Sequence, residues 1–357
     1  MRSLVQNVTL VIISAFLSLT VVEAALRLHD GVPVFSFDNL LAKRIDQLSQ
    51  DALAQYDPLL GWVQVPNVTK SQSGVTYTFG DQGIRMNGPE IEPLATGAVL
   101  AVGDSFTAGS EVNDGETWPA HLERILGEPV INAATGGWGT DQMILRAETL
   151  LPRLKPRRVI VGIMVDDILR AQFEFRSGAY KPVFVIEDGE LVHRNHPVPR
   201  YAGSRYEVGW LRSFLGHFHL VNWMMERIGY TEWWSKWDIT YRWAHQEGDK
   251  VTCRLLERLK RRLDADEAEL VVLFQYGASH IRGWSAPPPY QESVEACAQD
   301  LGVTVVDLWE DLREVQATDE AGFCALFVQQ GDCGTLGHMS SFGNRFVATR
   351  LSRALAQ

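Results

Sequence analysis

The chain has 357 residues, 46% of them hydrophobic and 22% charged, and its formal net charge at pH 7 is -11. This length exceeds one typical domain, and the apolar fraction is sufficient for a sizeable core. Because the acidic chain has no basic stripe, zinc-finger pattern or phosphate-binding Gly-x-x-x-x-Gly-Lys loop, the sequence argues against a nucleic-acid partner. Its close histidine pairs have no acidic or cysteine cluster beside them, so we expect no metal and no other cofactor.

The N-terminal segment is a candidate membrane helix. Residues Leu4–Leu26 are predominantly apolar, with Glu23 near the far end, and this length is enough to cross a bilayer. Arg2 precedes the stretch and no acidic residue does, which favours a cytoplasmic N-terminus and an exported remainder. A cleaved signal peptide is the alternative, because Val22-Glu23-Ala24 offers small residues that a signal peptidase accepts. We predict a transmembrane signal anchor over residues 1–28.

The candidate anchor also contains polar side chains, namely Gln6, Asn7, Ser14 and Ser18. Such groups gain free energy by facing another helix rather than lipid, although single anchors also tolerate small polar residues. Association with an integral membrane protein complex is therefore an expectation for the partner.

Residues 29–95 are interpreted as a stalk or N-terminal extension, with an amphipathic stretch around Leu40–Leu53 followed by turn-rich sequence. The core domain is predicted over residues 96–357. Its strands are predicted at Val99–Val102, Val130–Asn132, Val159–Ile163, Leu270–Phe274 and Val303–Val306. Helical sequence separates these strands, as right-handed crossovers between parallel strands require, so we predict an α/β fold with a doubly wound parallel sheet.

The segment between the third and fourth strands is too long for a simple crossover, and we interpret about residues 175–250 as an inserted cap. Within Lys181–Val198, the Asp188-Gly189 pair between alternating segments predicts a hairpin. The cap is rich in tryptophan, with Trp210, Trp223, Trp233, Trp234, Trp237 and Trp243. These rings fit an acyl pocket, a membrane interface or a protein-binding surface, and the alternative is a small core that covers the edge of the sheet.

Gly103-Asp104-Ser105 directly follows the first predicted strand of the core and precedes Phe106-Thr107-Ala108-Gly109. The serine therefore lies at the carboxyl edge of the sheet, where open α/β folds place their sites, and at a helix start whose amide groups face it. A nucleophile and a plain helix N-cap are both consistent with this position.

Further blocks resemble the SGNH/GDSL hydrolases of the membrane-anchored bacterial type. The second block is Asn132-Ala133-Ala134-Thr135-Gly136-Gly137, and the last runs from Gly337-His338 to Asn344. Upstream, Tyr56–Trp62 and Gly80–Arg85 look like members with a membrane anchor. The resemblance implies a flavodoxin-like sheet and a single-pass protein of the bacterial inner membrane with its soluble domain in the periplasm. It also implies that Ser105 is the nucleophile, that His338 is the base, and that the Ser105 and Gly137 amides form an oxyanion hole.

Two positions depart from the family pattern. Where the family has an oxyanion-hole asparagine, this chain has Asp166, which cannot donate a hydrogen bond when ionised. Protonation of Asp166 would restore a donor. The family's aspartate three residues before the histidine is also missing, because position 335 is threonine, and Asp332 is the candidate that orients His338. The alternatives are a solvated loop aspartate for Asp332 and a structural role for His338.

All cysteines follow position 250 and none forms a Cys-x-x-Cys pair, which argues against structural zinc. Cys253 and Cys297 fall in helical patterns that can pack side by side, so we predict a disulfide between them. Cys324 and Cys333 then close a short loop before His338. Four unpaired thiols in a reducing compartment are the alternative.

Two functions follow from these residues. The first is a membrane-anchored periplasmic ester hydrolase of unknown acyl or acetyl substrate, with Ser105, His338 and Asp332 as its triad. The second is a non-catalytic subunit of the same fold that scaffolds a membrane assembly, which Asp166 and the displaced Asp332 favour. Polysaccharide acetyltransferases that share the fold are a weaker third interpretation, because their Asp-x-His motif ahead of the serine is absent. An enzyme of the α/β-hydrolase type is disfavoured, because no Gly-x-Ser-x-Gly motif occurs.

Overall fold

The computed structural model describes residues 2–41, 54–90, 94–176, 179–200, 209–228, 234, 241–329, 333–334 and 336–356. The chain divides into two compact units. One unit comprises Met1–Asp51, Phe175–Ala179 and Tyr201–Arg242, and the other comprises Ala52–Glu174, Tyr180–Arg200 and Trp243–Gln357. The segment predicted as a cap is therefore shared between the two units, and part of it belongs with the N-terminal helix.

The second unit is built on a five-stranded parallel sheet. Its strands are β5 (Val99–Gly103), β6 (Val130–Asn132), β7 (Arg158–Met164), β13 (Glu269–Gln275) and β14 (Thr304–Asp307), in the order β14-β13-β7-β5-β6. This is the flavodoxin-like order, in which the first strand lies between the second and the third. The predicted α/β fold is confirmed, and each predicted core strand ends within one residue of its observed bounds.

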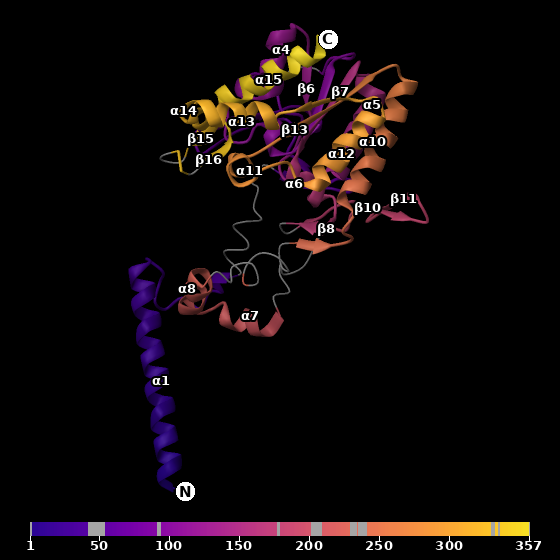
Figure 1. Ribbon diagram of the computed structural model, residues 1–357. Helices are drawn as coiled ribbons and strands as arrows, with labels where there is room; N and C mark the ends of the chain where they lie inside the picture. The colour runs from indigo at the N-terminus through magenta and orange to yellow at the C-terminus, as the bar shows by residue number, and fades with distance from the viewer. Residues whose placement is uncertain are drawn as a thin grey trace. The chain divides into compact units, whose positions relative to one another are not determined.

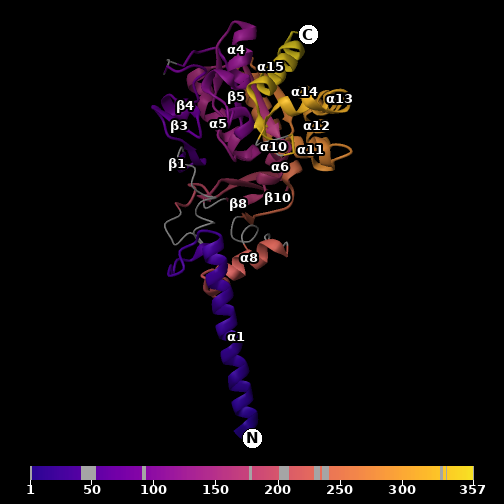
Figure 2. The ribbon, with the colours of Figure 1, turned by 90° about the vertical axis from the view of Figure 1, so that its left-hand side faces the viewer.

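Helices cover both faces of this sheet, as Figures 1 and 2 show. One layer contains α5 (Thr140–Leu154), α10 (Gly248–Ala265) and α12 (Pro289–Asp300), and the other contains α4 (Trp118–Leu126) and α15 (Ser341–Leu355). Strands buried on both faces need near-continuous apolar runs, which is why the core strands could be identified from sequence.

Shorter elements surround the sheet. The helical ones are η1 (Asp81–Gly83), α3 (Ser105–Ala108), η2 (Asp114–Glu116), α6 (Val165–Arg170), α11 (Ala278–Gly283), α13 (Trp309–Thr318) and α14 (Glu320–Ala325). The strands are β1 (Ala54–Asp57), β2 (Gly61–Gln64), β3 (Val68–Gln72), β4 (Val75–Phe79), β8 (Phe173–Arg176), β9 (Ala179–Tyr180), β10 (Val183–Glu187), β11 (Glu190–Arg194), β12 (Tyr241–Trp243), β15 (Phe327–Gln329) and β16 (Leu336–Met339). The predicted hairpin is formed by β10 and β11, with Asp188 and Gly189 both at positive φ in its turn.

Much of the segment interpreted as a stalk is part of the second unit. Strands β1 and β2 form one antiparallel hairpin, and β3 and β4 form another. Leu60, Val63 and Ile84 are buried in the same apolar core as the central strands. Burial of these side chains stabilises the attachment of residues 54–90 to the core. The amphipathic stretch predicted around Leu40–Leu53 falls mostly on residues 42–53, outside the described part of the chain.

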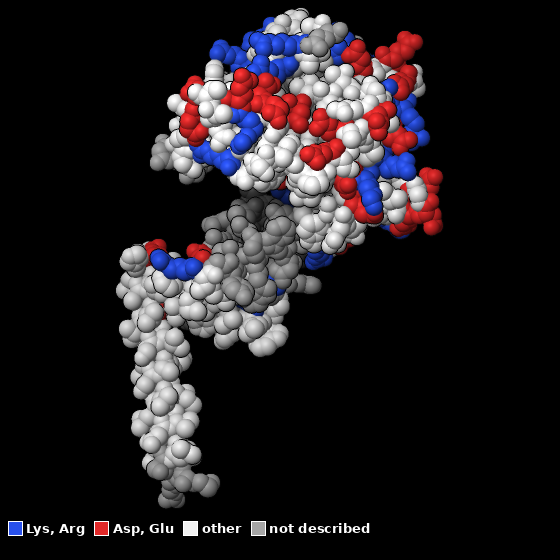
Figure 3. All heavy atoms as spheres, viewed as in Figure 1, with Lys and Arg blue, Asp and Glu red and all other residues white. Residues whose placement is uncertain are grey.

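The first unit contains α1 (Arg2–His29), α7 (Gly209–Leu215) and α8 (His219–Arg227). Leu4–His29 is the one helix among the described residues that is long and apolar enough to cross a membrane, with a mean hydropathy of 2.2. Figure 3 shows that its surface is free of charged atoms along most of its length. At its C-terminal end, Arg27 donates hydrogen bonds to the carbonyls of Pro33, Ser36 and His217, at 2.7 to 3.0 Å.

The tryptophans of the predicted cap do not share one environment. Trp234 is buried with Leu41 in a small apolar cluster and donates its indole N–H to Asn222 at 2.9 Å. Trp210 is 81% exposed and Trp243 46% exposed. Arg227 lies over the ring of Trp223, and Trp233 and Trp237 fall outside the described residues.

Both expected disulfides are present, Cys253–Cys297 between α10 and α12, and Cys324–Cys333 before β16. The first joins two helices that pack side by side, with 5.9 Å between the Cα atoms. It closes a loop over a sequence separation of 44 residues. Loop-closure entropy makes such a cross-link worth about 4 kcal/mol of unfolding free energy.

Replacement of both Cys253 and Cys297 with serine should therefore lower the free energy of unfolding by about 2–4 kcal/mol, because the unfolded chain regains conformational freedom. Urea unfolding of the wild-type protein and the variant, without added oxidant or reductant, measures the difference in the free energy of unfolding. In a background with Cys324→Ser and Cys333→Ser, treatment with a reductant should lower the stability by a similar amount, and no destabilisation in the Cys253 and Cys297 double variant would contradict the entropic account.

Candidate active site

Ser105 lies in the first turn of α3, immediately after β5. Asp104 is the N-cap of this helix and accepts a hydrogen bond from the Phe106 amide at 2.8 Å. Ser105 is therefore not the capping residue, and its hydroxyl lies 3.3 Å from Asp104 Oδ2. Gly103 allows α3 to approach the sheet closely, since a Cβ at this position would lie 2.2 Å from Thr107 Oγ1.

His338 connects Ser105 to a carboxylate. Ser105 Oγ lies 2.9 Å from His338 Nε2, and His338 Nδ1 lies 2.8 Å from Glu111 Oε2. The same Glu111 oxygen also accepts the backbone N–H of His338 at 2.7 Å. An ionised carboxylate only accepts hydrogen bonds, so it fixes Nδ1 as the protonated nitrogen and leaves Nε2 to accept the serine proton. Ser105, His338 and Glu111 thus have the contacts of an acid–base–nucleophile triad.

The backbone at Glu111 has a strained conformation that a hydrogen bond from its amide stabilises. Glu111 has a φ of 68°, a conformation that is rare for a residue with a side chain and is often found at functional sites. Its amide donates to the hydroxyl of Tyr77 at 3.1 Å. Gly337 leaves room for the carboxylate, because a Cβ there would lie 2.5 Å from Glu111 Oε2.

Arg85 holds the rest of this loop. Its buried guanidinium donates to the carbonyls of Ala108, Gly109 and Val112 at 2.5 to 2.6 Å and lies 3.3 Å from Asp114 Oδ1. Buried carbonyl groups need such partners, because they have lost their hydrogen bonds to water. The upstream block that ends at Arg85 therefore supports the loop that carries Glu111.

Asp332, the predicted triad acid, lies outside the described residues, and the place beside His338 Nδ1 is taken by Glu111. Glu111 was not among the candidates from sequence. It follows Ser105 by six positions, in a loop with several acidic residues, and no local pattern distinguishes it from them. The signal that identifies it is a contact between residues separated by 227 positions.

The predicted oxyanion-hole residues lie on neighbouring loops. A Cβ at Gly136 would be 3.7 Å from Ser105 Cβ, so the Gly136-Gly137 turn packs against the nucleophile. Gly137 has a φ of 79°, which favours glycine. Trp62 Nε1 donates to the Gly136 carbonyl at 3.1 Å, and Trp138 Nε1 donates to the Trp62 carbonyl at 3.0 Å. The upstream segment thus supports this turn as well.

Arg170 connects the loops beneath the site. It pairs with Asp104 at 2.8 Å and with Asp167, and lies 3.4 Å from the Trp138 carbonyl. Both carboxylates are fully buried. Burial raises the pKa of Asp167, as does Asp104, while Arg170 lowers it. Burial alone would lower the pKa of Arg170, but Asp167 and Asp104 raise it, so the cation is retained.

Asp166 lies in the first turn of α6, next to Asp167, and its side chain is 40% exposed. Its Oδ2 atom lies 3.7 Å from Nε2 of His280, a residue of α11 that the sequence did not single out. The third family donor is thus a carboxylate here, with an imidazole next to it.

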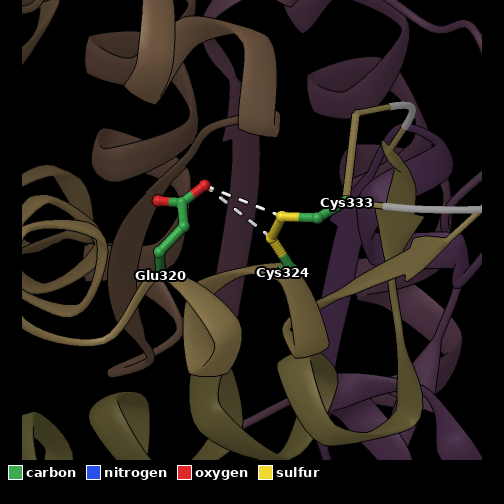
Figure 4. Close-up of side chains that lie close together, drawn as sticks. All are labelled: Glu320, Cys324 and Cys333. Carbon is green, nitrogen blue, oxygen red and sulfur yellow. Dashed lines mark hydrogen bonds between the residues drawn. A yellow bond between two sulfur atoms is a disulfide. The ribbon is translucent and has the colours of Figure 1, made fainter.

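One cluster of metal-ligand types occurs within the described ranges, formed by Glu320, Cys324 and Cys333 (Figure 4). The two sulfur atoms are joined in a disulfide, so they are not the thiolates that bind metals. Arg282 donates to Glu320 at 2.5 Å and to the Cys333 carbonyl at 2.7 Å. These three residues therefore belong to a disulfide-linked loop that Arg282 stabilises through hydrogen bonds.

The chain is similar to a family of known proteins and to several solved structures. Residues 101–345 match the model of the GDSL-like lipase/acylhydrolase family. Similar solved structures include a G-D-S-L family lipolytic protein from Desulfitobacterium hafniense, with 13% identity over 72% of this chain and 99% of that chain and a TM-score of 0.40. They also include the acetyl xylan esterase AlAXEase, with 14% identity over 72% and 98% and a TM-score of 0.42.

A third similar structure is the esterase EstA from Pseudoalteromonas, with 11% identity over 73% of this chain and 97% of that chain and a TM-score of 0.39. No curated protein matches the chain. The family model spans most of the chain and includes both Ser105 and His338, and the chain therefore belongs to the GDSL-like lipase/acylhydrolase family.

Proposed function

We propose that this protein hydrolyses an acyl or acetyl ester with Ser105 as nucleophile, His338 as general base and acid, and Glu111 as the carboxylate that orients His338. The observation that carries the proposal is the unbroken hydrogen-bonded series from Ser105 Oγ through the imidazole to Glu111 Oε2. A nucleophile within hydrogen-bond reach of a base, itself oriented by a third group, is the arrangement that covalent acyl transfer needs.

In the acylation half-reaction, Ser105 Oγ attacks the ester carbonyl carbon while its proton passes to His338 Nε2. The carbonyl oxygen becomes an oxyanion, and we expect the Ser105 and Gly137 amides to stabilise it. When the tetrahedral intermediate collapses, the C–O bond to the alcohol breaks and Nε2 returns the proton to the leaving oxygen. Glu111 stays ionised and stabilises the imidazolium that forms between these steps.

In the deacylation half-reaction, water attacks the acyl-serine carbonyl and His338 Nε2 takes its proton. Collapse of the second intermediate breaks the acyl–Oγ bond and returns the proton to Ser105. The products are a carboxylic acid and an alcohol, with the enzyme unchanged, so the cycle needs no cofactor.

A non-catalytic scaffold is the second candidate function, because Asp166 occupies the place of a family donor. An ionised carboxylate there would repel a developing oxyanion, and loss of one donor costs on the order of 100-fold to 1000-fold in rate. The hydrogen bonds of His338 favour the hydrolase. In the scaffold case, the partner would be an integral membrane protein complex.

The first prediction about function concerns Ser105. Purified protein should hydrolyse p-nitrophenyl acetate, and Ser105→Ala should reduce kcat by on the order of 10⁴-fold or more, because the nucleophile is lost. Equal rates for the two proteins would leave the scaffold as the better account, and stable co-migration of the detergent-extracted protein with a larger membrane complex would support it.

The second prediction separates the two candidate acids. Glu111→Gln should lower kcat by on the order of 10³-fold to 10⁴-fold, because an amide no longer fixes the productive tautomer of His338. Asp332→Asn is the matched control and should retain a rate within about threefold of wild type. The opposite result, with Asp332→Asn inactive and Glu111→Gln active, would assign the orienting role to Asp332.

We further propose that α1 anchors the protein in a bacterial inner membrane and that its soluble part is periplasmic. The support is a helix of sufficient length and apolarity, a basic residue ahead of it, and two disulfides, which persist in oxidising compartments.

The third prediction tests this topology in a bacterial host. Protease added to spheroplasts should digest the soluble part, whereas intact cells should protect it, because the outer membrane excludes the protease. A cytoplasmic protein serves as the control for lysis. Protection in both preparations, with digestion only after the inner membrane is broken, would place the soluble part in the cytoplasm.

A further inference from the structure

His280 lies beside the oxyanion-hole position whose usual donor is missing. The residue follows β13 and occupies the first turn of α11, while Asp166 follows the adjacent strand β7. His280 Nε2 is 3.7 Å from Asp166 Oδ2, so the imidazole lies next to the residue that stands where the family has an asparagine.

The structure fixes which nitrogen of His280 carries the proton. The Gly277 amide donates to His280 Nδ1 at 3.1 Å, so Nδ1 is an acceptor and Nε2 carries the hydrogen. Burial lowers the pKa of His280 by more than the Asp166 carboxylate raises it, so the neutral form is favoured. His280 therefore presents a neutral N–H donor toward Asp166. A neutral imidazole in this state can polarise a carbonyl oxygen.

The imidazole is held in place, as a catalytic donor must be. His280 stacks on Trp284, with 4.4 Å between ring centroids, and its side chain is only 12% exposed. Nε2 makes no hydrogen bond within the described part of the chain, the carboxylate of Asp166 being beyond hydrogen-bond distance. The Nε2–H group is thus held in one orientation and is not engaged in a hydrogen bond with any described residue. The side chain therefore needs little rearrangement to donate to an oxygen atom on which charge develops.

Gly277 lies between His280 and Phe106, a residue next to the triad. A Cβ on Gly277 would lie 3.7 Å from His280 Nδ1 and 3.8 Å from Phe106 Cζ. The ring of Phe106 in turn lies 5.1 Å from that of His338. Ser105, Asp166 and Gly277 each follow the end of one of three adjacent strands, so the donor and the nucleophile share one edge of the sheet.

We propose that His280 is a catalytic residue of the reaction described above and that its Nε2–H replaces the family asparagine as an oxyanion-hole donor. This inference rests on the proposed hydrolase function. Asp166 is the more exposed of the pair, at 40% against 12% for His280, so its carboxylate keeps solvent contact while the imidazole is mostly shielded from water. If His280 provides the third oxyanion-hole donor, an acidic residue can stand at position 166 without loss of that donor.

The fourth prediction tests the donor in the full-length protein, with p-nitrophenyl acetate as substrate. His280→Phe should lower kcat by on the order of 100-fold with little change in KM, because a transition-state donor is lost. His280→Gln places an amide N–H near the position of Nε2 and should retain most of the rate. In His280→Phe with Asp166→Asn, the family donor returns and kcat should rise at least about tenfold above the single variant.

A transition-state analogue distinguishes this role from a structural one. Phenylboronic acid forms a tetrahedral adduct on a serine hydroxyl, and its inhibition constant should rise in His280→Phe along with the loss of kcat. His245→Phe is the matched control. His245 also accepts a backbone N–H through Nδ1, at 3.0 Å from the Glu247 amide, but its ring contacts the backbone of Ala171 and Phe184 rather than the nucleophile, so its replacement should leave kcat unchanged.

Two results would overturn the assignment. One is a kcat for His280→Phe within about threefold of wild type, and the other is an equal loss in His280→Phe and His280→Gln without recovery on Asp166→Asn. If wild type and Ser105→Ala hydrolyse the ester equally, the hydrolase proposal itself fails. Ser105-dependent activity that is indifferent to His280 removes only the present inference.

Discussion

The active-site edge of this protein depends on one buried guanidinium. Arg170 neutralises Asp104 next to the nucleophile and Asp167 at the start of α6, and it approaches the carbonyl of Trp138 beside Gly137. These three residues come from the loops after three adjacent strands. Two buried carboxylates would be costly without a cation, and removal of one partner from such a group typically costs about 3–5 kcal/mol. The cluster therefore fixes the nucleophile loop relative to the oxyanion loop.

The residues upstream of the sheet complete this support. Trp62 donates a hydrogen bond to the Gly136-Gly137 turn. Arg85 donates hydrogen bonds to carbonyl groups at the end of α3 and in the loop that follows it. A loop that carries a residue at strained φ, as Glu111 does, stays in that conformation only when its surroundings determine it. The segment between the membrane helix and the first core strand thus contributes directly to the geometry of the site.

The chain departs from the family pattern at the orienting carboxylate and at the oxyanion-hole asparagine, two groups that assist the serine and the histidine. Near each of these sites lies another side chain of similar chemistry. A carboxylate contacts His338 from the loop after the nucleophile, and an imidazole N–H lies next to the carboxylate that replaces asparagine. The nucleophile and the base must lie within hydrogen-bond distance of each other, which restricts both residues to fixed positions. An orienting carboxylate or an oxyanion donor needs only to reach the right atom, so different loops can provide it.

The sequence by itself determined the five core strands and the hairpin at Asp188-Gly189, which follow from local patterns, namely apolar runs and turn residues. The disulfide partners followed from helical patterns that can pack side by side, and the Ser105–His338 pair from the resemblance of two sequence blocks to a known family. Only the tertiary structure decided that Glu111 contacts His338 and that His280 faces Asp166, because each pair is brought together by loops from separate strands. It also decided that residues 54–90 pack on the core, since short strands of mixed burial carry a weak periodic signal. Contacts over such separations depend on the packing of the whole sheet, which no local window of sequence contains.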